Sequence, residues 1–75
     1  MNEQKKEFGA RVRTMREART WSQEELAHRI GRSVFTVSSI ERGKGLPTVD
    51  TLAALVKALD ISAEELLAVF WKEED

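Results

Sequence analysis

The chain has 75 residues, with twelve lysines and arginines against thirteen aspartates and glutamates, and it contains no cysteine. The lack of cysteine excludes a disulfide framework, a zinc site with thiolate ligands and a cysteine nucleophile, and it is typical of a reducing compartment. No segment approaches the roughly eighteen apolar residues of a membrane-spanning helix, and the polar N-terminus lacks the apolar core of a signal peptide. We therefore expect one small cytoplasmic domain, residues 1–75, without a membrane partner.

The charges are distributed unevenly along the chain. Residues 1–44 hold ten lysines and arginines against six acidic residues, whereas residues 45–75 hold two against seven. One part of the surface can therefore face phosphate groups although the net charge is only −1. Ordinary solvated helix faces give the same distribution, so the charges alone leave both interpretations open.

The first helix is predicted over residues 3–19. Phe8, Val12 and Met15 follow one another at intervals of four and three residues, so their side chains form one stripe along a helix. Such a stripe is typical of a helix that packs on a core by one face. Trp21 is most simply a core residue that closes the junction with the next helix, rather than a side chain that stacks on a base.

A short helix is predicted to begin at Ser22. Ser22 and Glu25 have the spacing of a capping box, in which the hydroxyl and the carboxylate each bond a free backbone N–H group. An apolar stripe follows at helical spacing, formed by Leu26, Ala27 and Ile30. Gly31 can adopt the left-handed conformation that commonly ends a helix.

A second short helix is predicted directly after this turn. Ser33 is the next suitable N-cap, Val37 and Ile40 provide one buried seam, and Gly43 ends the helix. Two helices joined by a turn this short form a helix-turn-helix unit, here residues 22–43.

Two further helices are predicted in the acidic part of the chain. Thr48 caps the first, whose buried face consists of Leu52, Leu55, Val56 and Leu59. Ser62 and Glu65 repeat the capping-box spacing and begin a last helix, residues 62–72. Apolar side chains cover nearly its whole circumference, at Leu66, Leu67, Val69, Phe70 and Trp71. A terminal helix of a small domain has only one side on its own core, so we expect Phe70 and Trp71 to lie in a dimer interface.

These segments resemble the lambda repressor and Cro class of helix-turn-helix domains, the XRE family. The resemblance rests on Ser22-Gln23-Glu24-Glu25-Leu26-Ala27, Gly31 and Ser38-x-Ile40-Glu41-Arg42-Gly43. It extends over roughly residues 7–67, through Phe8-Gly9-x-Arg11-Val12-Arg13-x-x-Arg16 and Pro47-Thr48-x-x-Thr51-Leu52. It implies an all-α, compact five-helix fold of lambda-repressor type that binds double-stranded DNA.

The second helix of the pair is then the expected recognition helix. With Val37 and Ile40 facing inward, a rotation of about 100° per residue places other side chains on the outer face. The expected base contacts are Val34, Phe35, Ser38 and Ser39. The family often has glutamine, asparagine or arginine at such positions, whereas Val34 and Phe35 are apolar. They suit either the thymine methyl group in the major groove or a partner protein.

The resemblance also implies contacts to the DNA backbone from the residues that frame this helix. These are Gln23, Arg42, Gly43 and Lys44, through side chains, exposed backbone N–H groups and the helix N-terminus. Lys5, Lys6 and Arg11 are weaker candidates, for which a solvated surface cation is the simpler interpretation.

Two structural features follow from the same resemblance. Arg16 and Glu41 match a partly buried ion pair that fixes the angle between the first helix and the recognition helix. Thr20 stands where the family commonly has glycine, and a β-branched residue is uncomfortable at positive φ, so this corner is either strained or built differently.

An enzymatic function has little support in the sequence. The single histidine, His28, has no matching nucleophile, and the acidic pairs are better explained as first-turn helix charges and a solvated tail. We expect no metal, no cofactor and no small-molecule ligand. The expected function is a sequence-specific transcriptional regulator, a repressor or autoregulator, that binds a pseudo-palindromic operator as a homodimer. The alternative is a helix-turn-helix adaptor that binds a partner protein, as an antitoxin-like or anti-repressor module does.

Overall fold

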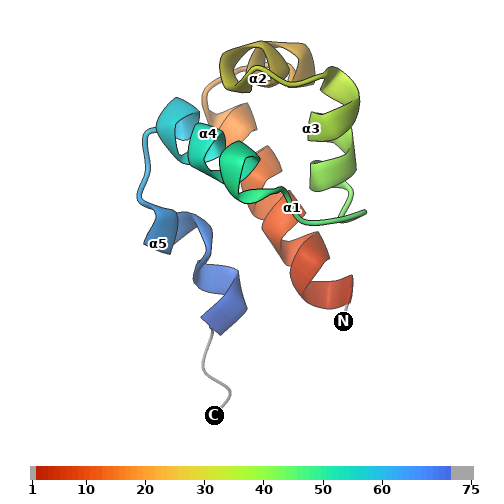
Figure 1. Cartoon of the computed structure of the whole chain (residues 1–75), viewed down its shortest axis with the longest axis vertical. Helices are drawn as coiled ribbons and strands as arrows, with labels where there is room; N and C mark the ends of the chain where they lie inside the picture. Colours follow the sequence, from red (N-terminus) through yellow and green to blue (C-terminus); the bar gives the residue numbers. More distant parts are fainter. Residues whose placement is uncertain (1, 72–75) are drawn as a thin grey trace.

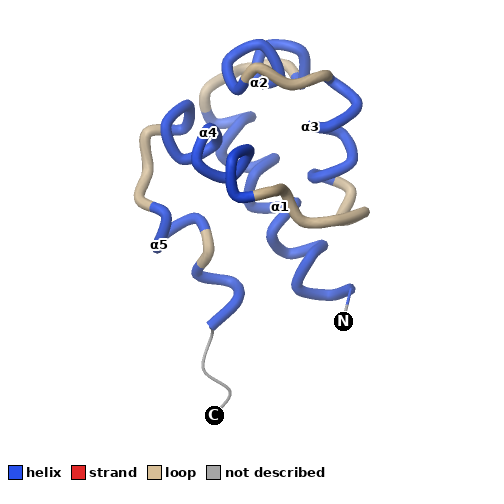
Figure 2. Tube along the Cα trace, in the orientation of Figure 1, coloured by secondary structure: helices blue, strands red, loops and turns tan. Residues whose placement is uncertain are grey.

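The computed structural model describes residues 2–71, and this part of the chain is built from helices without any strand (Figures 1 and 2). The α-helices are α1 (Asn2–Ala18), α2 (Gln23–Ile30), α3 (Val34–Glu41), α4 (Val49–Leu59) and α5 (Ala63–Leu66), and they are followed by a 3₁₀ helix, η1 (Ala68–Trp71). The expected all-α, five-helix class is confirmed. Within residues 2–71, no helix has the length and apolar character needed to cross a lipid bilayer.

Four helices begin where a hydroxyl side chain accepts a hydrogen bond from the backbone N–H three residues later. The caps are Ser22 for α2, Ser33 for α3, Thr48 for α4 and Ser62 for α5. These predicted helix starts are confirmed. The capping box also predicts that the carboxylate of Glu25 accepts a hydrogen bond from a backbone N–H group at the helix start. This part of the prediction is wrong, because the carboxylate pairs instead with Nε of Arg29 at 2.8 Å.

Residues with positive φ end four helices: Thr20 after α1, Gly31 after α2, Gly43 after α3 and Asp60 after α4. Gly31 (φ 69°) and Gly43 (φ 73°) adopt this conformation without strain, whereas Thr20 (φ 60°) carries a β-branched side chain there. The N–H of Trp21 donates to the carbonyl oxygen of Arg16, and that of Thr20 to Glu17, which is the pattern of a Schellman motif. The sequence left open whether the corner at Thr20 is strained or built differently. The structure has the strained form, with Thr20 at positive φ.

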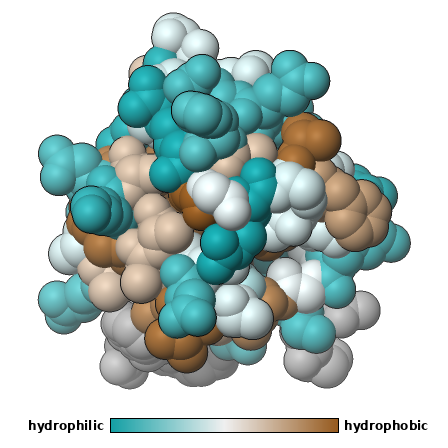
Figure 3. Space-filling view, turned by 45° about the horizontal axis from the view of Figure 1, so that its top comes forward, coloured by the Kyte–Doolittle hydropathy of each residue, from teal (hydrophilic) through white to brown (hydrophobic). Residues whose placement is uncertain are grey.

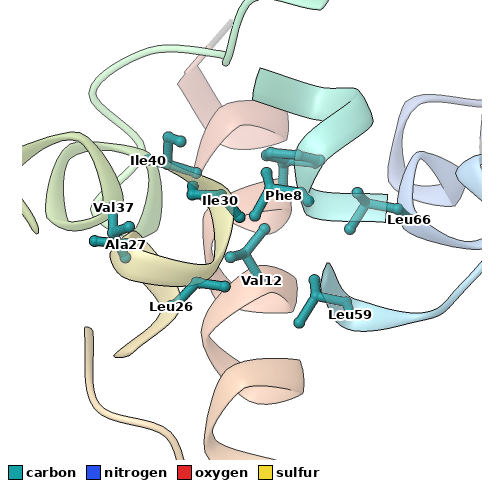
Figure 4. Close-up of a cluster of buried hydrophobic side chains, with 10 residues drawn as sticks. Phe8, Val12, Leu26, Ala27, Ile30, Val37, Ile40, Leu59 and Leu66 are labelled. Atoms are coloured by element: carbon teal, nitrogen blue, oxygen red, sulfur yellow. The ribbon is translucent and has the colours of Figure 1, made fainter. Parts of the chain in front are cut away.

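The core lies between α1 and the other helices. Figure 4 shows Phe8 and Val12 of α1 in the middle, with residues of α2 and α3 on one side and Leu59 and Leu66 on the other. The buried apolar side chains are Phe8, Val12, Leu26, Ala27, Ile30, Val37, Ile40, Leu55, Leu59 and Leu66. Trp21 is half-buried and packs against them, as the sequence predicts.

A close approach between α1 and α3 sets the position of α3. A Cβ atom on Gly9 would lie 2.3 Å from the carbonyl oxygen of Ile40 and 2.7 Å from that of Glu41. Any side chain at residue 9 would therefore push the C-terminal end of α3 away from α1. Contacts with α1 and α2 hold α3 at the edge of the molecule (Figure 1).

The prediction of one continuous helix over residues 62–72 is wrong. α5 ends at Leu66, and a 3₁₀ turn follows in which the N–H of Phe70 donates to the carbonyl oxygen of Leu67. The bend returns the ring of Phe70 to α1, with its centroid 5.7 Å from that of Phe8. Phe70 thus covers the protein's own core and is half-buried. The side chain of Trp71 lies outside the part of the chain that the structure describes.

Candidate nucleic-acid interface

The N-terminal half of α3 carries apolar side chains into solvent. Phe35 is 70% exposed and Val34 is 42% exposed. Figure 3 shows apolar atoms surrounded by hydrophilic ones at the right-hand edge of the molecule, the side on which α3 lies in Figure 1. Exposed apolar groups gain nothing from water, so this face is suited to a partner with apolar groups of its own.

The two serines expected to face the same partner lie further along α3. Ser38 and Ser39 are both half-buried. The hydroxyl of Ser38 accepts a hydrogen bond from Nε of Arg42 at 3.2 Å, one turn later on the helix. Ser38 and Arg42 therefore form one polar unit at the C-terminal end of this face.

A bidentate ion pair fixes α3 against α1. Nε of Arg16 donates to Oε2 of Glu41 at 2.6 Å, and Nη2 donates to Oε1 at 3.0 Å, while the side chains are 10% and 3% exposed. Nη1 of Arg16 also donates to the carbonyl oxygen of Trp21. The hydrogen bond to Glu41 raises the pKa of Arg16 against the opposing effect of burial, so this arginine stays charged.

Gln23 lies at the start of α2, where the resemblance implies a phosphate contact. Its Nε2 donates to Oε1 of Glu41 at 3.0 Å, so the amide completes the ion pair between α1 and α3. An amide nitrogen carries two N–H groups, which leaves one for another acceptor. Gln23 therefore joins the first turn of α2 to the end of α3.

The turn after α3 corrects part of the phosphate-contact expectation. The backbone N–H groups of Arg42, Gly43 and Lys44 donate to carbonyl oxygens of Ser38, Ile40 and Ser39, respectively. These N–H groups are engaged within the chain, so the expectation that they are free to hold a phosphate is wrong. Gly43 provides the positive φ of the turn, while the side chains of Arg42 and Lys44 are exposed.

The weaker cation candidates lie on α1. Nε of Arg11 donates to the carbonyl oxygen of Glu65, which ties α1 to α5. Lys5 is half-buried, and Lys6 is exposed and close to the turn, since a Cβ atom on Gly43 would lie 2.8 Å from its Cγ. Lys6 therefore lies beside the turn that ends α3.

The structure adds one cation that the sequence pattern does not single out. Arg32, in the turn between α2 and α3, donates from Nε to the hydroxyl of Thr51 at 3.0 Å. It lines a cleft between α3 and the start of α4, together with Phe35 and Lys44. A basic residue in the turn is a weak signal, because helical periodicity does not predict where a turn side chain points.

Comparison with known proteins gives consistent results. A family model described as a helix-turn-helix domain matches residues 7–69. The chain is 37% identical to the uncharacterized HTH-type transcriptional regulator YazB of Bacillus subtilis, over 79% of this chain and 86% of YazB. It is 34% identical to the cryptic phage CTXphi transcriptional repressor RstR of Vibrio cholerae, over 87% of this chain and 58% of RstR.

Solved structures agree with these sequence relatives. The restriction-modification controller protein C.AhdI from Aeromonas hydrophila superposes with a TM-score of 0.77 at 38% identity, over 81% of this chain and 92% of that one. The P22 c2 repressor protein, solved in complex with a synthetic operator, superposes with a TM-score of 0.77 at 35% identity, over 80% and 91%. The chain therefore belongs to the helix-turn-helix family of DNA-binding transcriptional regulators, of the lambda repressor (XRE) type.

Proposed function

We propose that this protein is a sequence-specific repressor or autoregulator that binds a pseudo-palindromic operator as a homodimer. The observation that carries the proposal is α3, which exposes Phe35 while a buried ion pair fixes its other end. Such a helix enters the major groove with its N-terminal residues on the base edges. RstR is named a repressor, and the P22 c2 repressor was solved with an operator. A protein with this function acts on DNA in the cytoplasm.

Base recognition is assigned to the outer face of α3. Phe35 and Val34 are proposed to contact thymine methyl groups, because the methyl group is the apolar feature of the major-groove base edges. Ser38 and Ser39 are proposed to donate shorter and less discriminating hydrogen bonds to bases or phosphates. Because only thymine offers this methyl group, contacts from Phe35 and Val34 would favour A·T pairs in each half-site.

Backbone contacts are assigned to side chains on either side of α3. Arg42 and Lys44 supply exposed positive charge after the helix, and Gln23 supplies the second N–H group of its amide at the start of α2. Gly43 contributes the shape of the turn that carries Lys44. These contacts position the protein on the duplex and give no sequence preference of their own.

The homodimer requires an apolar surface other than the outer face of α3. Leu46 is 50% exposed and Val49 is 80% exposed, and both lie between α3 and the rest of α4. Beside them is a small apolar pocket of about 90 Å³, whose walls include Leu46, Leu52 and Phe70. An isologous interface pairs the same patch on two copies, and Leu46 supplies an exposed apolar group that also forms part of the wall of this recess. We propose that it pairs two copies and spaces their α3 helices about 34 Å apart, with Phe70 in the wall of the recess. We propose Trp71 as a second residue of this interface.

The experiment that tests this function is selection of binding sites from random double-stranded DNA. The expected result is a pseudo-palindrome with thymine-rich half-sites whose centres lie about one helical turn apart. A matched selection with Phe35→Ala is expected to lose preference at one or two positions in each half-site. If wild-type protein enriches no sequence and instead retains a partner protein through Val34 and Phe35, the adaptor function replaces the proposed one.

A further inference from the structure

A cleft of about 380 Å³ lies between α3 and the loop that leads into α4. Its volume is within the range of roughly 300–1,000 Å³ that is usual for binding sites. Phe35 and Leu46 supply apolar wall, and Arg32 and Lys44 supply positive charge from two different segments of the chain. The cleft therefore combines apolar surface with two cations directly beside the recognition helix.

Arg32 is held in place from within the protein. Its Nε donates to Thr51 Oγ1 at 3.0 Å, and its Nη1 donates to the carbonyl oxygen of Gly31 at 3.1 Å. Thr51 is itself buried, and it receives a hydrogen bond from the hydroxyl of Thr48 at 3.2 Å. The guanidinium is thus oriented by two fixed acceptors before any ligand arrives, which reduces the ordering entropy that binding would otherwise lose.

The positive charge of the cleft is not neutralised by the protein. Within residues 2–71, neither Arg32 nor Lys44 forms an ion pair with a carboxylate. The Nη2 group of Arg32 has no acceptor in the same part of the chain and keeps two N–H groups for an outside partner. Two cations that face one cleft without an acidic neighbour favour an anionic ligand.

We propose that this cleft seats one backbone phosphate of the operator together with its deoxyribose, and that Arg32 and Lys44 hold the phosphate. The apolar carbons of the sugar suit the ring of Phe35, and the phosphate oxygens suit the planar guanidinium. The proposal rests on the DNA-binding function proposed above. It makes Arg32 a phosphate contact that joins the turn before α3, the first turn of α4 and the DNA backbone.

The test separates contact with a phosphate from a purely structural role of Arg32. Arg32→Gln removes the charge and keeps an amide that can donate to Thr51. The matched control is Arg13→Gln, which removes one exposed arginine from α1, where it pairs with Glu17. Binding to the selected operator is measured over a range of salt concentrations, for both variants and for wild-type protein. We expect the slope of log K against log salt to fall by about one for Arg32→Gln and to stay unchanged for Arg13→Gln.

A second measurement locates the phosphate. Operators in which one phosphate at a time is replaced by a neutral methylphosphonate are bound to wild-type protein and to Arg32→Gln. At one position in each half-site we expect wild-type binding to weaken by about tenfold, as for loss of a charge-assisted hydrogen bond, and Arg32→Gln to be nearly insensitive. Inorganic phosphate serves as the probe for binding of a free anion to the cleft. We expect the operator to displace it from wild-type protein.

The outcomes distinguish the two proposals. If wild-type protein binds the operator but Arg32→Gln keeps both the salt slope and the methylphosphonate pattern, the cleft proposal is wrong and the function stands. A second outcome is that inorganic phosphate binds the wild-type protein but not Arg32→Gln, while both proteins respond alike to every methylphosphonate position. The cleft then binds a free anion, and its assignment to the DNA backbone is overturned. If wild-type protein binds no DNA, both proposals fail. Should Arg32→Gln not fold, Lys44→Ala in the same methylphosphonate series decides, because the same position is expected to become insensitive.

Discussion

Arg16 of α1 and Glu41 at the end of α3 bond each other at two points, although 25 residues separate them in the sequence. Replacement of Arg16 by alanine would leave the carboxylate of Glu41, only 3% exposed, without its cation. We expect the free energy of unfolding to fall by about 3–5 kcal/mol. Urea unfolding of Arg16→Ala measures this loss.

The control for this prediction is the exposed pair on α1. Arg13 and Glu17 lie 3.0 Å apart, with side chains 63% and 54% exposed. Solvent screens such a pair, so Arg13→Ala is expected to lower the free energy of unfolding by less than about 1 kcal/mol. Equal losses from the two variants would show that the buried pair does not fix α3.

The strained corner after α1 predicts a stabilising substitution. Thr20 has a φ of 60°, a conformation that disfavours a β-branched side chain by roughly 1–2 kcal/mol. Thr20→Gly is expected to raise the free energy of unfolding by about 1 kcal/mol, because relief of this strain outweighs the added freedom of glycine in the unfolded chain. Thr14→Gly, at an exposed position inside α1, is expected to lower it by about 0.5–1 kcal/mol. A Thr20→Gly protein that melts below wild type contradicts the assignment of strain.

The proposed phosphate contact of Lys44 predicts a change in how strongly DNA binding depends on salt. If its side chain holds a phosphate, Lys44→Ala should weaken binding to all sequences alike and lower the slope of log K against log salt by about one. Lys57, exposed on α4, provides the control, and Lys57→Ala is expected to leave the slope unchanged. An unchanged slope for Lys44→Ala would remove this residue from the DNA contacts.

The proposed dimer surface can be tested at Val49 without disturbing the core. Val49 is 80% exposed in the chain described, so Val49→Glu should leave folding intact but place a charge in the interface between two copies. Sedimentation is expected to show a monomer at concentrations where wild type is a dimer, with binding reduced on a complete operator more than on a half-site. The control is His28→Glu, at an exposed position of α2, rather than a change at Ala53, which lies one turn after Val49 on the same face of α4. Dimers of unchanged strength in Val49→Glu would exclude this surface.

Features that depend on neighbouring residues could be predicted from the sequence. Each N-cap brings a hydroxyl to an N–H group only three residues away, so Ser22, Ser33, Thr48 and Ser62 identify their helix starts. The inward seam of Val37 and Ile40 predicts which face of α3 is exposed, and Phe35 lies on that face. Local spacing was therefore sufficient for these helix starts and for the exposed face of α3, whereas the arrangement of the helices followed from the family resemblance.

Features that depend on distant residues could not be predicted in this way. The break after Leu66 brings Phe70 to Phe8, a contact between opposite ends of the chain, and helical periodicity alone favours a continuous helix. The link from Arg32 to Thr51 likewise follows from the packing of α4 beside the turn. In both cases the missing information was the position of another helix.

The most direct test of DNA reading by α3 compares thymine with uracil at the half-site positions that depend on Phe35. Uracil lacks only the methyl group, so a methyl contact predicts that wild-type protein binds the uracil operator more weakly by roughly 1 kcal/mol per position, as for a single base contact. Phe35→Ala is expected to bind both operators equally well, with the salt slope of wild type. Equal binding of both operators by wild-type protein, at positions where Phe35→Ala still relaxes the preference, would contradict the methyl contact.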